Sequence, residues 1–389
     1  MNLGFYYHIP AVLSDQGIKT PAYLGVFLDA LAQEVDLLTL FMHLSRNPND
    51  PNASYSLKSR NIHFVSLGQK TPAWDRFIRP GRTLKKIESE IKKCDLVLVR
   101  APSPLSPNFQ KKFGKTSKIS YLVVGDYIDD SKNLDQPFIK KLVIQLLSVR
   151  NDKQLTNALK RSTTLVNSAK LQEKYSKVVR DLHLIKTTTL TSNDFFQRDD
   201  TCQRNDIKIL YTGSFCLSKG VMDLINAVAI ICQDRKSLSL HFVGWETLPK
   251  RPYVEIMKNR ITELGLDNIV YFHGFKSVGR ELNDMYRMAD IYVLPSYQEG
   301  FPRTIWEAMA NSLPVIATRV GSIPHYLQDR VNAILIEPRN PNQIVNAIRE
   351  MINNEELRRS IISSAFELVQ ENTLEIQTRK LVKIITEEF

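Results

Sequence analysis

The sequence predicts an α/β protein with two domains, each built on a parallel sheet. Short apolar runs bounded by turn residues alternate with helical segments along the chain, and both halves repeat this alternation. At 389 residues the chain also exceeds what one hydrophobic core usually supports. Its 43% apolar and 24% charged residues are typical of a globular protein.

Seven apolar runs in the first half are predicted to be strands. Continuous runs rich in Leu, Ile and Val are typical of parallel strands that helices cover on both faces. The runs are Leu3 to Ile9, Asp36 to Met42, Ile62 to Leu67, Asp95 to Val99, Ile119 to Val124, Thr164 to Asn167 and Leu182 to Ile185. They define a first domain over residues 1–190.

The second half repeats the pattern after a polar segment, residues 190–205, which lacks apolar periodicity and is predicted to be the linker. Residues 206–370 form the second predicted domain, and residues 371–389 hold a last helix, about Leu374 to Glu388. Six strands are expected in the second domain, at Ile207 to Tyr211, Leu238 to Val243, Ile269 to Phe272, Ile291 to Leu294, Val315 to Thr318 and Ala333 to Ile336.

The segment from Ser296 to Pro314 places two carboxylates around a helix N-terminus. It follows a buried strand, and Pro302 suits the first residue of a helix that Pro314 ends. Backbone N–H groups at such a start bind anions. Glu299 precedes the helix, while Glu307 lies five residues past Pro302, about 7.5 Å along the axis. This spacing fits a nucleotide sugar; the alternative is that Glu307 simply faces water.

A second loop offers a cation between a strand and the predicted helix Val221 to Cys232. Gly213 permits close approach of the backbone to a ligand, and Lys219 can contact a phosphate. Taken alone, the loop is also compatible with an ordinary turn between a strand and a helix.

These residues resemble those of retaining GT-B glycosyltransferases of family 4, over about residues 207 to 345. The sequence E-G-F-P-R-x-x-x-E-A-M-A, which starts at Glu299, matches a variant of the E-x7-E signature of that family. The resemblance implies two Rossmann-like domains that face a central groove, with the last helix crossing back to the first domain. It also implies sugar transfer with retention from a nucleoside diphosphate sugar of UDP or GDP type, without a metal or other cofactor.

The resemblance also assigns roles to matching residues. Glu299 would hold the sugar hydroxyls and Glu307 the ribose, and the phosphates would lie on the helix start and on Gly300, Phe301 and Pro302. Lys219 would be the phosphate-binding lysine of the family's G-R-x-x-x-x-K-G loop, and it is expected to be catalytic together with Glu299.

Three further positions of the second domain follow from the resemblance. The Arg of the family's lysine loop is Ser214 here, after Gly213. Arg303, or else Lys19 of the first domain, is expected to supply the missing cation, and Arg303 is preferred because arginine binds phosphate with two parallel hydrogen bonds. The segment His273-Gly274-Phe275 resembles the part whose main chain contacts the nucleobase; alternatively, His273 caps backbone groups at a strand end.

The first domain carries weaker signals. Gly17 is expected near a donor phosphate, where the family commonly has a Gly-Gly pair. Asp126, just past a predicted strand, is the candidate catalytic base, with a helix N-cap as the alternative. The family's P-N-G-V-D segment is absent, and Thr189 to Asp194 stands in its place, so the hinge is expected to differ.

Several classes of protein are excluded or disfavoured. The chain has no G-x-G-x-x-G, no phosphate-binding P-loop, no H-E-x-x-H and no D-x-D after a strand, so no metal site is expected. No run reaches the roughly 18 apolar residues of a membrane span, and the N-terminus does not resemble a signal peptide. The cysteines have no metal-binding spacing and are predicted to be free thiols, which favours a cytoplasmic protein; they are Cys94, Cys202, Cys216 and Cys232.

The charge is concentrated in the first half. Residues 1–200 carry 30 Lys and Arg against 19 Asp and Glu, whereas residues 201–389 carry 22 of each. Trp74, Phe77 and Ile78 lie among arginines, which suits an anionic membrane surface and a lipid-linked or other glycan acceptor. The adjacent stripe of Leu84, Ile87 and Ile91 is also compatible with a helix that docks on a sheet.

Two other functions remain open at this stage. One is a different reaction of the same fold, such as epimerisation of a sugar nucleotide. The other is a nucleotide-binding or nucleic-acid-binding module that uses the basic half, although the chain lacks an aromatic stacking motif and no nucleic acid is expected.

Overall fold

The computed structural model describes residues 1–389 except residue 16 and residues 51–52, 133–137, 235–236, 247–252 and 388–389. The chain divides into two units: Met1–Thr187 with Glu375–Phe389, and Thr188–Leu374. The predicted linker, residues 190–205, therefore lies within the second unit. The physical reason is that Leu190 joins the core of that unit and the Arg198 guanidinium donates hydrogen bonds to the carbonyls of Arg287 and Ala289.

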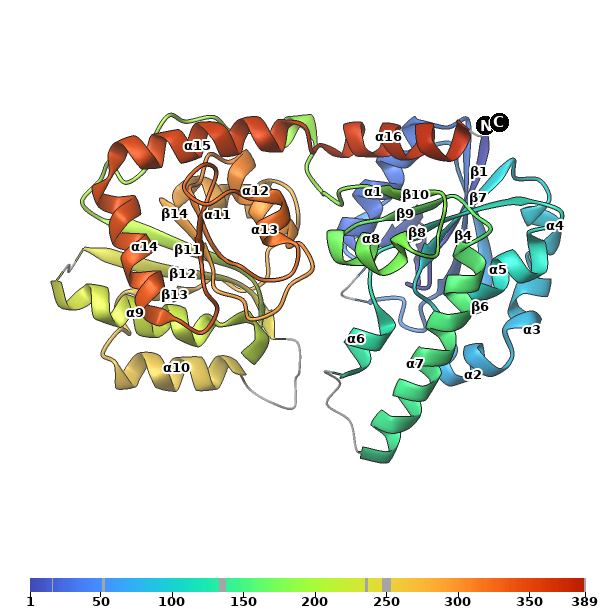
Figure 1. The fold of residues 1–389 in the computed structure, drawn as a ribbon, viewed down its shortest axis with the longest axis horizontal. Helices are drawn as coiled ribbons and strands as arrows, with labels where there is room; N and C mark the ends of the chain where they lie inside the picture. The colour runs from blue at the N-terminus through green and yellow to red at the C-terminus, as the bar shows by residue number, and fades with distance from the viewer. Residues whose placement is uncertain (16, 51–52, 133–137, 235–236, 247–252, 388–389) are drawn as a thin grey trace. The chain divides into compact units, whose positions relative to one another are not determined.

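The first unit is built on a seven-stranded parallel sheet (Figure 1). From edge to edge its strands are β10 (Leu182–Leu184), β9 (Thr164–Val166), β8 (Lys118–Val123), β7 (Leu96–Ala101), β1 (Asn2–Tyr6), β4 (Leu37–Leu44) and β6 (Ile62–Gln69). The chain order reverses between the neighbours β1 and β7, and such a switch point is where open α/β sheets bind ligands.

Helices cover both faces of this sheet because successive strand residues point to opposite sides. Leu96 and Leu98 face one core, with α1 (Ala22–Gln33) and α16 (Leu374–Thr386), while Val97 and Val99 face the other. The helices that contribute to the second of these cores are α3 (Pro80–Lys85), α4 (Glu88–Ile91), α5 (Ser106–Phe113), α7 (Phe138–Leu159) and α8 (Ala169–Ser176).

The C-terminal helix α16 belongs to the first unit from Glu375 onward. Its side chains Leu381 and Ile385 are fully buried beside residues of β1 and α1. The chain thus returns to its first unit at its end, as the predicted fold requires.

The second unit contains a six-stranded parallel sheet. Its strands are ordered β13 (Val270–Phe272), β12 (Leu238–Glu246), β11 (Ile207–Phe215), β14 (Ile291–Leu294), β15 (Val315–Thr318) and β16 (Ile334–Ile336). This is the Rossmann order, with its switch point between β11 and β14. The helices are α9 (Val221–Asp234), α10 (Tyr253–Glu263), α11 (Arg280–Met288), α12 (Arg303–Ala310), α13 (Ile323–Tyr326), α14 (Pro341–Asn353) and α15 (Glu355–Gln370), with 3-10 turns η1 (Ser192–Asp194) and η2 (Leu217–Lys219).

Every predicted strand coincides with an observed one, and the differences lie in smaller elements. The first unit also has an antiparallel sheet of β2 (Val12–Ser14), β3 (Gly17–Thr20) and β5 (Tyr55–Ser56), whose two to four residues per strand are too short for a hydrophobic pattern, and the short helices α2 (Ala73–Ile78) and α6 (Tyr127–Lys132). Pro302 is the N-cap of α12, not its first residue. Among the residues placed by the structure, no helix is both long and apolar enough to cross a bilayer.

Candidate active site

The loop between β14 and α12 holds Glu299 at the carboxyl edge of the second sheet. One carboxylate oxygen, Oε1, accepts a hydrogen bond from Ser296 Oγ at 2.7 Å and from Lys219 Nζ at 2.6 Å. The Glu299 side chain is 10% exposed and that of Lys219 24%. The structure therefore brings together two of the three predicted catalytic residues, Glu299 and Lys219, which are 80 positions apart in the sequence.

Lys219 is held by a tight junction between η2 and α9. Gly220 is left-handed, with φ of 63°, and a Cβ there would lie 2.0 Å from the Pro295 carbonyl oxygen. The two loops are also joined by a hydrogen bond from the Tyr297 amide to the Ser218 carbonyl, at 2.8 Å. Only glycine fits this contact, so the loops that carry Lys219 and Glu299 are fixed against each other at the switch point.

Glycines also allow the surrounding backbone to pack closely. A Cβ at Gly321 would lie 2.0 Å from the Glu299 carbonyl oxygen, and the Ser322 amide donates to the Gly300 carbonyl at 2.8 Å. A Cβ at Gly244 would similarly lie 1.7 Å from the Gly213 carbonyl oxygen. Gly321 and Gly244 therefore lie directly against the main chain of the candidate donor site.

Glu307 is buried, which contradicts the alternative of a glutamate that faces water. It is 6% exposed, and its two oxygens accept hydrogen bonds from Thr189 Oγ1 at 3.0 Å and Tyr286 Oη at 2.9 Å. Burial and the nearby carboxylate raise the pKa of Tyr286 well above its ordinary value. Because a carboxylate has about four lone-pair positions, Glu307 keeps capacity for ligand hydroxyls.

Thr189, Tyr286 and Ser296 were not among the predicted site residues. Thr189 lies 118 positions from Glu307, so no local pattern connects them. The signal for Ser296 was its place three residues before Glu299, in the loop after a buried strand.

The other predicted donor residues differ in what their side chains do. Phe301 stacks on Trp306, with ring centroids 4.4 Å apart, and meets Tyr326 edge to face, so its ring is part of the packing of α12. Arg303 is the first residue of α12 and is partly buried. Ser214 lies inside β11, where its carbonyl accepts a hydrogen bond from Tyr211 Oη at 2.9 Å.

Among the residues that the structure describes, the His273 ring contacts another histidine and not a backbone group. Its Nε2 lies 2.9 Å from His241 Nδ1, and the two imidazoles are stacked. Phe275 is 55% exposed and contacts Trp245 edge to face, with centroids 5.4 Å apart. Two half-exposed aromatic rings therefore contact each other, Trp245 near the end of β12 and the predicted donor residue Phe275 just after β13.

The two predicted residues of the first unit have distinct surroundings. Asp126 accepts hydrogen bonds from the Ile128 amide and from Lys174 Nζ, both at 2.9 Å, and Lys174 also contacts Asp152 at 2.6 Å. Although burial opposes its charge, these hydrogen bonds raise the pKa of Lys174. The hydrogen bond from the Ile128 amide to Asp126 is the kind that a helix N-cap residue accepts, here at the start of α6. Gly17 has φ of 104° and begins β3, with no atom near its would-be Cβ.

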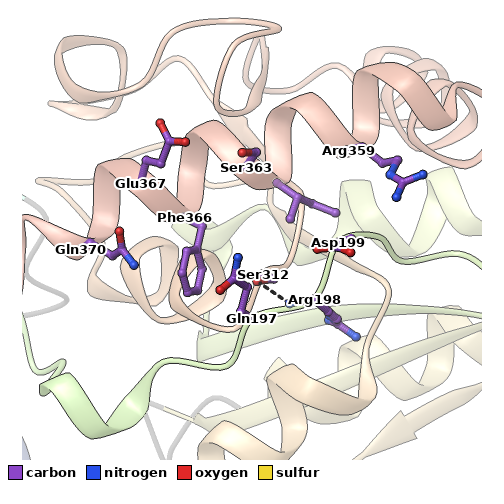
Figure 2. Close-up of a pocket in the computed structure, with 10 residues that line it drawn as sticks. Gln197, Arg198, Asp199, Ser312, Arg359, Ser363, Phe366, Glu367 and Gln370 are labelled. Carbon is purple, nitrogen blue, oxygen red and sulfur yellow. Dashed lines mark hydrogen bonds between the residues drawn. The ribbon is translucent and has the colours of Figure 1, made fainter.

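A cavity of about 380 Å³ lies elsewhere in the second unit, between residues 197–199 and α15 (Figure 2). Arg359 and Phe366 of α15 line it, together with Ser312, whose hydroxyl accepts a hydrogen bond from the Arg198 amide at 3.2 Å. None of the predicted donor residues lines this cavity. It is therefore separate from the site that the sequence predicts.

Residues 193–368 match the family model described as glycosyl transferases group 1. The chain is 36% identical to the glycosyltransferase MJ1178 of Methanocaldococcus jannaschii over 152 residues, which are 39% of this chain and 40% of that protein. The chain thus spans about two fifths of the length of that relative. The chain is also 27% identical to protein CapJ of Staphylococcus aureus, over 87% of the length of this chain and 82% of the length of CapJ.

The structure of Anabaena Alr3699/HepE in complex with UDP is similar over the whole of both chains, with a TM-score of 0.75 and 17% sequence identity. At this identity the similarity establishes the fold alone. The two parallel sheets and the C-terminal helix that belongs to the first unit are features of the GT-B fold predicted from the sequence. Residues 193–368 therefore resemble a glycosyl transferases group 1 domain, in a chain that has the GT-B fold.

Proposed function

We propose that the protein transfers a sugar from a nucleoside diphosphate sugar to an acceptor hydroxyl, with retention and without a metal. The carrying observation is the 2.6 Å contact of Lys219 with Glu299 at the switch point of the second sheet, with Glu307 on the following helix. These groups supply a cation for a phosphate and two carboxylates for hydroxyl groups.

Lys219 is positioned to stabilise the charge of the leaving diphosphate. Its ammonium has three donors and gives one to Glu299, so others can contact a phosphate oxygen. As the bond between the anomeric carbon and the diphosphate breaks, negative charge grows on the leaving oxygen, and a preorganised cation lowers that barrier. The acceptor oxygen forms the new bond, and its proton leaves with the diphosphate or with a base.

Glu299 has two tasks in this proposal. It fixes Lys219 by an ion pair, and its Oε2 oxygen remains available to accept hydrogen bonds from sugar hydroxyls. Glu307 would hold the ribose hydroxyls, and the preorganised contacts with Thr189 and Tyr286 would fix its orientation. A nucleotide of UDP type is supported by the Alr3699/HepE structures, which are described as complexes with UDP and with UDP-glucose.

Thermal unfolding with UDP, GDP, ADP and their glucose conjugates tests the donor site. A ligand at a hundred times its dissociation constant stabilises its protein by about 2.7 kcal/mol, which is readily detected. We expect one diphosphate to stabilise the second unit, and Glu307→Ala to weaken its binding by roughly tenfold, the loss of a hydrogen bond to a charged group. Glu263→Ala, on the surface of α10, is the control.

A failure of every nucleotide to stabilise the wild type would contradict the proposal. If a nucleotide does bind, incubating the protein with the corresponding nucleotide sugar in the absence of acceptor, followed by product analysis, distinguishes transfer from epimerisation. A changed sugar still attached to the nucleotide would favour the epimerase alternative.

We further propose that the acceptor is a lipid-linked or other glycan precursor at an anionic membrane, with the first unit as the docking side. The predicted stripe of Leu84, Ile87 and Ile91 does not provide this surface, because all three side chains are buried in the core. The side chains of Trp74 and Ile78 lie outside the described residues.

Helix α7 supports the membrane proposal in a different place. Leu142, Val143, Leu146 and Val149 are 47–64% exposed on one side of its first turns. Along the same side, Arg150, Lys153 and Lys160 follow and are exposed. An apolar end that continues into a basic face fits insertion at the interface of an acidic bilayer.

Flotation with liposomes tests this docking. We expect recovery with vesicles that contain an anionic lipid, little recovery with neutral vesicles, and loss of binding in a Leu142→Ser/Leu146→Ser variant. Val178→Ser, at another exposed apolar residue of the first unit, is the control. Equal recovery in both kinds of vesicle would contradict the electrostatic part of the proposal.

A further inference from the structure

A group of basic side chains gathers at the carboxyl edge of the first sheet. His8 follows β1, His43 lies near the end of β4, Lys70 follows β6, and Arg100 lies near the end of β7. These strands are neighbours in the order β7-β1-β4-β6, which contains the switch point of the unit. Arg76, from α2, belongs to the same group, because its positive charge contributes to lowering the pKa of His8, His43 and Lys70. We call these five residues the cationic cluster.

Two members of the cluster are buried with side-chain nitrogen atoms that have no hydrogen-bond partner among the described residues. Arg76 is 5% exposed, and its Nε and Nη1 atoms are enclosed without a hydrogen-bond partner within the described part of the chain. His43 is 2% exposed; its Nδ1 lies 3.4 Å from the Gly68 carbonyl, and its Nε2 has no such partner. Unsatisfied buried donors are costly and rare in folded proteins, and a bound acceptor of hydrogen bonds removes that cost.

Arg100 and His8 line the same edge with further donors. The Arg100 guanidinium lies over the ring of Tyr7 at 4.6 Å, and its Nε is buried without a partner among the placed residues. Tyr7 in turn meets the His8 ring edge to face, and His8 Nδ1 is also without a partner there. The cluster thus offers unsatisfied nitrogen atoms from three separate strands and from α2.

The charged members of the cluster lie close enough to affect one another's protonation. Burial and the three cations of the cluster lower the pKa of His8 to about 3, and burial together with cations that include Lys86 lowers the pKa of His43 to about 4. Burial and Arg76 lower the pKa of Lys70, and the negative charge of Asp50 opposes this effect. Binding of an anion from solution is therefore favoured at this edge of the sheet.

We propose that the cationic cluster binds a phosphate or diphosphate group of the acceptor substrate. The fork of Arg76 matches a phosphate with two parallel hydrogen bonds, Lys70 and Arg100 add charge, and the neutral imidazole of His8 can donate one hydrogen bond from Nδ1. Three cations around one position suit a doubly charged phosphate better than a single carboxylate. The assignment to the acceptor rests on the proposed function, in which the donor residues lie in the second unit; the anion site itself does not.

Calorimetric titration of the full chain with pyrophosphate, methyl phosphate and acetate tests the site. We expect pyrophosphate to bind most tightly and Arg76→Gln to weaken it at least tenfold, with Arg76→Lys intermediate because it keeps the charge and loses the fork. Arg79→Gln removes the same charge from the exposed end of α2 and is expected to stay within twofold of the wild type.

Lys70→Gln provides a second test if Arg76→Gln does not fold, because Lys70 is less enclosed. Wild-type affinity in both variants, or an equal loss in Arg79→Gln, would overturn the site and leave only a general effect of net charge. Acetate that binds as tightly as pyrophosphate would overturn the phosphate assignment.

The source of the phosphate group is resolved by two further probes. One is a soluble sugar phosphate, and the other is a vesicle of neutral lipid to which phosphatidic acid is added as the phosphate-bearing component. Binding of either probe that depends on Arg76 supports the proposal and identifies a soluble or a lipid-linked acceptor, while binding of neither overturns it.

Titration with UDP separates this site from the donor site. We expect Arg76→Gln to leave UDP affinity unchanged and Glu307→Ala to reduce it. A loss of UDP affinity in Arg76→Gln equal to the loss for pyrophosphate would overturn the acceptor assignment, because the cluster would then hold the donor. A third outcome is that the wild type binds pyrophosphate but no nucleotide, and that Arg76→Gln abolishes pyrophosphate binding. This outcome would support the anion site and contradict the proposed function.

Discussion

The ion pair of Lys219 and Glu299 is the residue-scale feature on which the proposed chemistry depends. Both side chains are largely enclosed, so their interaction is screened less than that of a surface pair. Its position, not its strength, makes it useful, because the ammonium is held where two βα loops meet. A neutral partner would leave the cation in place but less well oriented.

Glu299→Gln is expected to lower kcat by roughly a hundredfold, comparable to the loss of one preorganised group that stabilises transition-state charge. The amide keeps the shape of the side chain but cannot hold Lys219 by charge. Steady-state kinetics with the identified donor measures this, and Glu263→Gln is the surface control. A kcat within threefold of the wild type would contradict a catalytic role.

His43 makes the stability of the first unit depend on pH. Its folded-state pKa of about 4 is below its ordinary value of 6.5, so between these values the unfolded chain binds more protons. The stabilising contribution is complete above about pH 6.5 and is lost as pH falls toward 4. Acidification from pH 7 to 5 is expected to lower the free energy of unfolding by on the order of 2 kcal/mol for this residue.

Denaturant unfolding of the first unit across this pH range provides the measurement. His43→Asn is expected to flatten part of the dependence, with the remainder due to His8, whose pKa is lowered in the same sense. His63→Asn, at an exposed histidine of β6, should leave the slope unchanged. An unchanged slope in His43→Asn would show that this imidazole does not titrate as described.

At the scale of elements, the donor site depends on how closely two loops approach. The turn at Gly220 and the segment after β14 are in direct backbone contact, which is why Lys219 and Glu299 meet. The sequence predicted both loops from local signals: a strand before each, a glycine in each, and a helix after each. Their mutual contact is a consequence of the strand order, which places β11 beside β14.

Gly220→Ala separates backbone strain from steric contact. Gly220 and Gly265 have similar φ values of 63° and 69°, but only at Gly220 would a Cβ meet another atom, the Pro295 carbonyl oxygen. Each alanine is expected to cost about 1–2 kcal/mol for the left-handed backbone, and Gly220→Ala about 1–3 kcal/mol more for the collision. Unfolding of the second unit and affinity for the donor should show this. Equal effects of the two substitutions would contradict the contact.

Helix α7 shows where element-level prediction was incomplete. A stripe of apolar residues is normally read as the face that packs on a core, and the stripe of Leu84, Ile87 and Ile91 behaves in that way. Leu142 and Leu146 are just as apolar, yet they are 47% and 64% exposed. Hydropathy alone does not distinguish a buried stripe from an exposed one. Exposure depends on which helices find room to pack on a face of the sheet.

At the scale of the whole molecule, each unit has its own core and the C-terminal helix belongs to the first. The 15 residues from Glu375 to Phe389 are therefore separated from the rest of their unit by the whole of the second unit in sequence. The stability of the first unit consequently depends on residues at the far end of the chain.

Leu381→Ala is expected to destabilise the first unit by roughly 2–5 kcal/mol, the usual cost of a cavity at a fully buried leucine. The second unit, which has a separate core, should retain its transition. Ile376→Ala, on the exposed side of the same helix, is expected to change stability by about 0.5 kcal/mol or less. Calorimetry that resolves the two transitions measures both. A shift in the second transition alone would contradict the assignment of α16.

The sequence by itself determined the α/β class and the positions of all predicted strands, and it predicted the principal residues of the proposed donor site. These depend on local information: apolar runs for buried strands, and the spacing of Glu299, Glu307 and the intervening Pro302 for a helix start. Only the tertiary structure decided which side chains meet. The contact of Thr189 with Glu307 and the assembly of the cationic cluster join residues from distant segments, and their proximity is set by the order of strands in each sheet, which no local pattern encodes.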